Sequence, residues 1–101
     1  MDKGIEKDLL DKLKTSIGII SDNGELDSFY RDKLQTAVDD YKTEDISENV
    51  LTSDYGKSAI VLYATLLLKG ADIATNPSII FARNKLSLLT KGERKEDVDG
   101  V

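Results

Sequence analysis

Cysteine, histidine and tryptophan are absent from this sequence of 101 residues, and proline and methionine occur once each. Without cysteine the chain has no disulfide framework and no thiolate metal site, and this composition fits a reducing compartment. Without histidine it lacks the commonest general base and the commonest transition-metal ligand. Ser-His-Asp and Cys-His catalysis within one chain are therefore excluded.

The chain also lacks an excess of positive charge and a long apolar run. Fourteen basic and 19 acidic side chains give a net charge of −5, so the overall field does not steer the protein toward nucleic-acid phosphate. The longest apolar run, 59-AIVLYATLLL-68, is about half of the roughly 20 residues that a membrane span needs. The charged, amphipathic start contains no apolar core of a signal peptide, and we expect none.

Alternating strand patterns are scarce, whereas helical spacing is plentiful, which predicts an all-α fold. We expect a compact four-helix domain with helices over 3–17, 25–42, 54–69 and from Pro77 to 90–92. Gly18 would end the first helix, and Asn76 and Pro77 would begin the fourth. The segment 43–53 is predicted to be a loop that can hold a short helical turn at 46–51. Three residues in it suit N-caps: Ser47, Thr52 and Ser53.

The second and third predicted helices differ in the pattern of their apolar residues. The second is amphipathic, and its apolar face consists of Leu26, Tyr30, Leu34, Ala37, Val38 and Tyr41. The third is apolar all round, which predicts a central helix with the others packed around it. The domain would occupy residues 1–92, and the charged segment 93–101 is predicted to be a flexible, disordered tail, or one that orders on a partner.

The fourth predicted helix, 77-PSIIFARNKLSLL-89, carries two apolar stripes. With a step of about 100° per residue, Ile79, Ala82, Leu86 and Leu89 share an inward face. Phe81 and Leu88 lie on the nearly opposite side, with Ile80 on one flank. One interpretation is that the helix is enclosed within its own subunit, between the third helix and the loop at 43–53. The other is that Phe81 and Leu88 contact another protein chain.

No motif for catalysis, cofactor binding or metal binding is evident. The adjacent carboxylates Asp39 and Asp40 diverge by about 100° on a helix and are poorly placed to share a proton or a metal. The stretch 21-SDNGELD-27 lacks the alternation of a calcium loop, and no phosphate-binding glycine motif occurs. We therefore predict no catalytic residue, no cofactor and no metal ligand, and a function based on contact.

The order of elements resembles the small all-helical head–tail connector (adaptor) proteins of tailed bacteriophages. The resemblance covers roughly residues 5 to 92 and is carried by 9-LLDKLKTSIGIISDNGELDSFYRDKLQTAVDDYKTEDIS-47 and 58-SAIVLYATLLLKGADIATNPSIIFARNKLSLL-89. The shared features are a turn at Ile17-Gly18-Ile19, a helix with regularly spaced apolar residues from Leu26 to Tyr41, a very apolar helix with Tyr63, and a last helical turn of the form Leu-x-x-Leu at Leu86–Leu89. The polar loop at 43–53 and the charged tail depart from the family pattern.

The resemblance implies a non-enzymatic structural protein of the virion. Many copies would form a ring below the portal at the head–tail interface after DNA packaging, in particles made in the bacterial host cytoplasm. The ring would complete the DNA channel and dock tail or stopper proteins. Its partners would be further copies of itself, the portal protein and the tail or stopper protein. DNA would pass through without specific binding, and neither a membrane nor a small-molecule substrate would be involved.

Two sets of residues would serve this function. The subunit or partner interface would comprise Ile80, Phe81, Leu88, Arg83, Lys85, Lys91, Arg94 and Lys95. An acidic face that lines the channel would comprise Asp32, Asp39, Asp40, Glu44 and Asp45. Weakly attractive or repulsive walls suit a channel through which DNA slides, because a basic groove would hold it by counterion release.

The competing hypothesis is a small acidic helical inhibitor of a basic enzyme, similar to an immunity protein or antitoxin. The same acidic residues would then mimic phosphate. A DNA-binding regulator needs a basic recognition helix, and the fourth helix offers only Arg83 and Lys85 within its body. An enzyme has still less support in the sequence.

Overall fold

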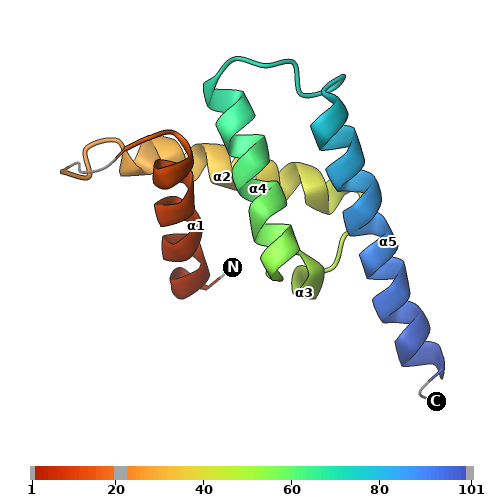
Figure 1. The fold of residues 1–101 in the computed structure, drawn as a ribbon. Coiled ribbons are helices and arrows are strands. Elements are labelled where there is room, and N and C mark those ends of the chain that lie inside the picture. The colour runs from red at the N-terminus through yellow and green to blue at the C-terminus, as the bar shows by residue number, and fades with distance from the viewer. Residues whose placement is uncertain (1, 20–22, 100–101) are drawn as a thin grey trace.

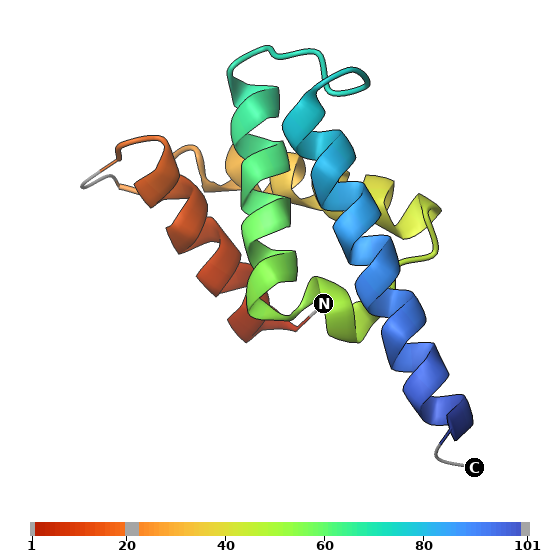
Figure 2. The ribbon, with the colours of Figure 1, turned by 45° about the vertical axis from the view of Figure 1, so that its right-hand side comes forward.

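The computed structural model describes residues 2–19 and 23–99, with side chains described up to residue 93. Within these residues the secondary structure is entirely helical, which confirms the predicted all-α class. Five helices follow one another: α1 (Lys3–Ser16), α2 (Asp27–Thr43), α3 (Glu48–Leu51), α4 (Asp54–Leu68) and α5 (Pro77–Asp99). Helices α1, α4 and α5 lie side by side and cross over α2, while the short α3 lies at the foot of α4 (Figures 1 and 2).

Helices α1 and α2 begin and end close to the predicted residues. Oδ1 of Asp2 accepts the Ile5 N–H at 2.9 Å and caps α1. The chain turns at Gly18, whose φ of 84° lies in the left-handed region that glycine adopts without a Cβ clash. Helix α2 begins at Asp27, two residues later than predicted, and Leu26 is its N-cap. Leu26 is therefore not part of the apolar face of α2.

The segment 43–53 contains the short helix α3, where the sequence allowed a helical turn at 46–51, so the described chain has five helices rather than four. Ser47 Oγ accepts the Val50 N–H at 3.2 Å and caps α3, and Ser53 Oγ accepts the Gly56 N–H at 3.1 Å and caps α4. Both serines were predicted N-caps. Helix α3 places Val50 and the fully buried Leu51 in the core, which explains why a mostly polar segment folds back onto the domain.

Helix α4 contacts each of the other four helices. Its buried residues are Gly56, Ala59, Ile60, Val61, Tyr63, Ala64 and Thr65. Leu62 and the leucines at 66–68 are only partly buried and pack at the edge of the core. None of the described helices combines the length and the apolar character that crossing a membrane requires.

Helix α5 begins as predicted and ends later than predicted. The Ser78 and Ile79 N–H groups donate to Asn76 Oδ1 at 2.9 and 3.3 Å, with Pro77 at the first helical position. The predicted end near 90–92 is wrong, because the helix continues to Asp99. A single glycine at 92 does not interrupt a stretch that is otherwise rich in Glu, Lys and Arg, which favour helix. The domain boundary after residue 92 stays a prediction.

Candidate interaction surface

One face of α5 packs against the rest of the protein. Ile79, Ala82 and Leu86 are at most 2% exposed, as predicted for the inward face. Leu89 was predicted to join them but is 42% exposed, and Thr90 is buried in its place. Thr90 lies within about 20° of Ile79 on the helical wheel and Leu89 about 80° away, so helix phase turns Thr90 inward. The Ser47 N–H donates to its Oγ1 at 3.2 Å and so satisfies the buried hydroxyl.

The opposite face of α5 is largely exposed, and Phe81 also borders a groove lined by Tyr55 and Leu62 of α4. Phe81 is 65% exposed, Leu88 67% and Ile80 45%. The interpretation that the segment 43–53 encloses this face is wrong. Helix α3 meets α5 on the inward side, where Ser47 Oγ donates to Glu93 Oε2 at 3.2 Å. We call the set Ile80, Phe81 and Leu88 the outer face of α5.

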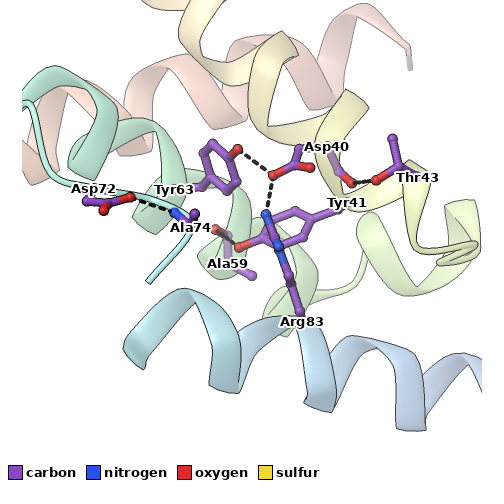
Figure 3. Close-up of polar contacts among 8 residues, drawn as sticks. All are labelled: Asp40, Tyr41, Thr43, Ala59, Tyr63, Asp72, Ala74 and Arg83. Carbon is purple, nitrogen blue, oxygen red and sulfur yellow. Dashed lines mark hydrogen bonds and ion pairs between the residues drawn. The ribbon is translucent and has the colours of Figure 1, made fainter. Parts of the chain in front are cut away.

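Arg83 and Asp40, predicted for two separate surfaces, contact each other instead. Arg83 Nη2 donates to Asp40 Oδ2, and the Tyr63 hydroxyl donates to the same oxygen (Figure 3). The two charged side chains are 25% and 29% exposed, so the ion pair is partly screened by water. It joins the C-terminal end of α2 to the middle of α5, with α4 contributing the tyrosine. Arg83 and Asp40 therefore hold the fold together rather than forming an open binding surface.

Two tyrosines that pack edge to face surround this ion pair. The ring centroids of Tyr41 and Tyr63 are 5.4 Å apart, and the Tyr41 hydroxyl donates to the Ala59 carbonyl oxygen at 3.0 Å. Burial raises the pKa of Tyr63 to about 12, with a further contribution from its hydrogen bond to Asp40. Burial likewise raises the pKa of Tyr41 well above its ordinary value. Neither phenol is therefore poised to act as a base near neutral pH.

The remaining basic residues of the predicted interface differ in their surroundings. Lys85 is exposed, and its Nζ lies 4.2 Å from the ring centroid of Tyr55, a cation–π contact between α5 and α4. Lys91 is exposed on the same helix. The side chains of Arg94 and Lys95 lie outside the described residues. Positive charge thus flanks the outer face of α5 in a chain whose net charge is negative.

The predicted acidic residues do not form one face. Asp32 and Asp39 are exposed on the same side of α2, where Asp39 Oδ1 accepts a hydrogen bond from Gln35 Nε2 at 2.8 Å. Glu44 follows the helix at its C-cap, and Asp45 has a positive φ of 59° in the turn beyond it. Asp40 points toward α5. Two carboxylates of the five therefore remain together on the exposed side of α2.

The structure reveals a second exposed apolar patch that sequence reasoning missed. Leu26 is 56% exposed and Phe29 is 43% exposed. They border a shallow groove between the end of α1 and the end of α4, lined also by the partly buried Ile17 and Leu68. We call Leu26 and Phe29 the turn patch. A helical wheel places Leu26 with Tyr30, but the wheel does not apply before the first helical residue.

The described residues include several exposed apolar surfaces that could contact another chain. No group of three or more acidic side chains among them is arranged to hold a metal ion. Six large apolar side chains of this part of the chain are exposed, and all belong either to α5 or to the turn patch. Comparisons with protein family models, with characterised proteins and with solved structures gave no match. The resemblance to phage connectors therefore rests on the sequence pattern alone.

Proposed function

We propose that this protein is a non-enzymatic head–tail connector of a tailed bacteriophage. In this proposal, many copies assemble into a ring below the portal once DNA has been packaged. The ring continues the DNA channel and gives a tail or stopper protein its docking surface. Residues Lys91 to Val101 bind the portal protein. The protein is made in the host cytoplasm and works at the head–tail interface of the virion.

The observation that carries the proposal is the outer face of α5. Exposed large apolar side chains that lie together usually mark an interface. Phe81 and Leu88 are seven residues apart, and so stand two turns apart on one side of the helix, each more than half exposed. A protein that works only as a folded monomer gains nothing from this arrangement. A subunit that must pack against another chain needs it.

The proposed arrangement of the domain separates packing from assembly. Helix α4 serves as the central scaffold, and the other helices present their outer faces to neighbouring proteins. Contacts within a ring are heterologous, so one surface of each subunit meets a different surface of the next. The exposed side of α2, with Asp32 and Asp39, faces the channel in this arrangement and leaves DNA free to slide.

The alternative of an acidic inhibitor has less support from the described side chains. An inhibitor that mimics phosphate needs several carboxylates on one accessible face. Asp40 is paired with Arg83, while Glu44 and Asp45 lie beyond the helix that carries Asp32 and Asp39. That function also leaves the outer face of α5 without a role.

The test replaces Phe81 and Leu88 with serine. Both side chains are exposed, so the monomer should keep its helical content and its unfolding midpoint. We expect assembly on portal-bearing phage capsids to be abolished, as measured by the mass of protein that co-sediments with the capsids. The control replaces the exposed Lys7 and Asp11 of α1 with serine and should assemble normally. If the double variant of α5 assembles as well as the control, this interface is wrong.

A further inference from the structure

The start of α2, where the turn patch lies, and helix α5 are at opposite ends of α2 (Figures 1 and 2). Helix α2 sets their separation. Phe29 lies near its first residue, and Asp40, which binds Arg83 of α5, lies near its last. Eleven residues separate these positions, which corresponds to about 16 Å along a helix at 1.5 Å per residue. The two apolar surfaces are therefore separate patches, one near each end of α2.

Two distinct patches are what a head-to-tail contact between identical copies requires. A symmetric dimer formed through α5 alone would bury the outer face twice and leave every turn patch exposed. A contact between the turn patch of one copy and the outer face of the next covers both surfaces in every subunit of a closed ring. Such pairing would bury exposed Leu and Phe side chains of each copy against apolar groups of its neighbour.

One acidic residue beside the turn patch, Glu25, is opposite in charge to the lysines beside the outer face of α5. From Ile73 through Gly92 the chain contains three basic residues and no acidic one. The exposed residues beside the outer face include Lys85 and Lys91. From Thr15 through Tyr30 the chain contains three acidic residues and no basic one, and Glu25 is exposed directly beside Leu26. Asp27 of this segment is paired with Lys14 at 2.6 Å.

Two lysines also border the turn patch. Lys33 Nζ lies 4.8 Å from the ring centroid of Phe29, and Lys69 lines the groove behind it. The charge match therefore joins Glu25 to the lysines of α5, rather than one uniformly acidic face to one uniformly basic face. Apolar contact supplies the area, and Glu25 orients the turn patch on the helix.

We propose that the occupant of the outer face of α5 is the turn patch of a second copy of this chain, with Glu25 placed beside Lys85 and Lys91. This inference rests on the proposed function, because it names the surface that completes the ring contact. It goes beyond that function by assigning a role to Leu26, Phe29 and Glu25. It also fixes the polarity of the assembly, since each subunit contributes different surfaces to its two neighbours.

Cross-linking can test this pairing cleanly because the chain has no cysteine of its own. Ser28→Cys places a thiol beside the turn patch, and Asn84→Cys places one on the exposed side of α5, with the apolar residues left intact. A mixture of the two single variants, treated with a short bis-maleimide, should form a cross-linked dimer about tenfold faster than either variant alone, because a specific contact raises the local thiol concentration. Lys7→Cys mixed with Asn84→Cys serves as the background control.

Charge exchange provides the second arm. Glu25→Lys should slow cross-linking of the mixture several-fold, and so should the paired change Lys85→Glu and Lys91→Glu on the other partner. Combining the two altered partners should restore the rate, because opposite charges again face each other. Far-UV circular dichroism of each variant verifies that its helical content is unchanged.

Three results would overturn the inference. Faster cross-linking of Asn84→Cys with itself would indicate a symmetric contact through α5. A mixed rate equal to the control, with a native mass that still rises with concentration, would place the acceptor surface elsewhere and leave the ring proposal standing. A mixed rate equal to the control, with a monomeric mass at every concentration and no recruitment to portal-bearing capsids, would count against both proposals.

Discussion

Replacing Gly56 with alanine should destabilise the protein, although the same change stabilises most helices. Gly56 lies in the first turn of α4 and is buried against α3. A Cβ at this position would lie 2.1 Å from the Val50 carbonyl oxygen and 2.4 Å from that of Leu51. Both obstacles are backbone atoms, so no side-chain rotation relieves the clash. Helix α3 would have to move away by about 1 Å to reach ordinary contact.

The magnitude follows from what α3 places in the core. Moving it opens a gap beneath Leu51, which is fully buried, and beside Val50, which is 6% exposed. Partial loss of such packing costs about 2–4 kcal/mol, in the range of large-to-small substitutions in a core. The higher helix propensity of alanine offsets up to about 1 kcal/mol of this cost. We therefore expect a net loss of about 1–3 kcal/mol.

Urea unfolding followed by circular dichroism measures this loss. With a slope of about 1–1.5 kcal/mol per molar urea for a small domain, the midpoint should fall by about 0.7–3 M at unchanged slope. Gly92→Ala is the matched control, because its added Cβ meets nothing within 4 Å. This change should raise the free energy of unfolding by up to about 1 kcal/mol, and the urea midpoint should rise slightly with it. A Gly56→Ala variant as stable as the original protein would refute the close approach of α3 and α4.

The ion pair and the exposed carboxylates support three further predictions. Arg83→Gln leaves Asp40 without its cation and should lower the free energy of unfolding by about 1–2 kcal/mol, after allowance for screening by water. Amide hydrogen exchange along α5 should become faster, and unchanged exchange would mean that the pair does not anchor the helix. The pKa of Tyr63 is about 12 when folded and 10.0 when unperturbed, so its stabilising contribution is complete below pH 10 and is lost as pH rises toward 12. The urea midpoint of the protein should therefore fall more steeply over that window than that of Tyr63→Phe, and parallel curves would contradict the assignment. Replacing Asp32 and Asp39 with lysine should leave assembly intact but add DNA binding that weakens with salt. The logarithm of the binding constant should fall with the logarithm of the salt concentration, with a slope of about one for each phosphate that the new lysines neutralise. Salt-independent binding, or none, would argue against a channel-facing role.

Local signals in the sequence predicted the helix starts well. Asn76, Ser47 and Ser53 each cap a helix through contacts that span only two or three residues, so their effect is visible in a short window. The end of α5 was harder to predict because Gly92 resembles a stop signal. A glycine ends a helix only when the chain turns there, and nothing else in 93–99 favours a turn.

Contacts between distant segments could not be read from helical periodicity. Helix α3 has four residues, too few to show a period. Asp40 and Arg83 are 43 residues apart, and each looked like a surface charge on its own helix. The burial of Thr90, by contrast, follows from helix phase, because Thr90 lies within about 20° of Ile79 on the wheel and Leu89 about 80° away. What the sequence did not show is the partner of its hydroxyl, the Ser47 N–H 43 residues earlier.

The ion pair that the sequence did not reveal also decides what α5 presents outward. Arg83 and Phe81 are two residues apart and so point about 160° away from each other on a helix. Holding Arg83 against Asp40 therefore turns Phe81 to the exposed side of α5, beside the groove next to α4, and Leu88, seven residues further, follows on the same side. The buried Ile79 and Leu86 fix the rotation of α5 about its own axis, because turning them outward would expose apolar surface to water. The partly screened ion pair adds to this restraint, because rotation would leave Asp40 without its partner. The ion pair between α2 and α5 therefore helps to set the orientation of the surface that we assign to assembly.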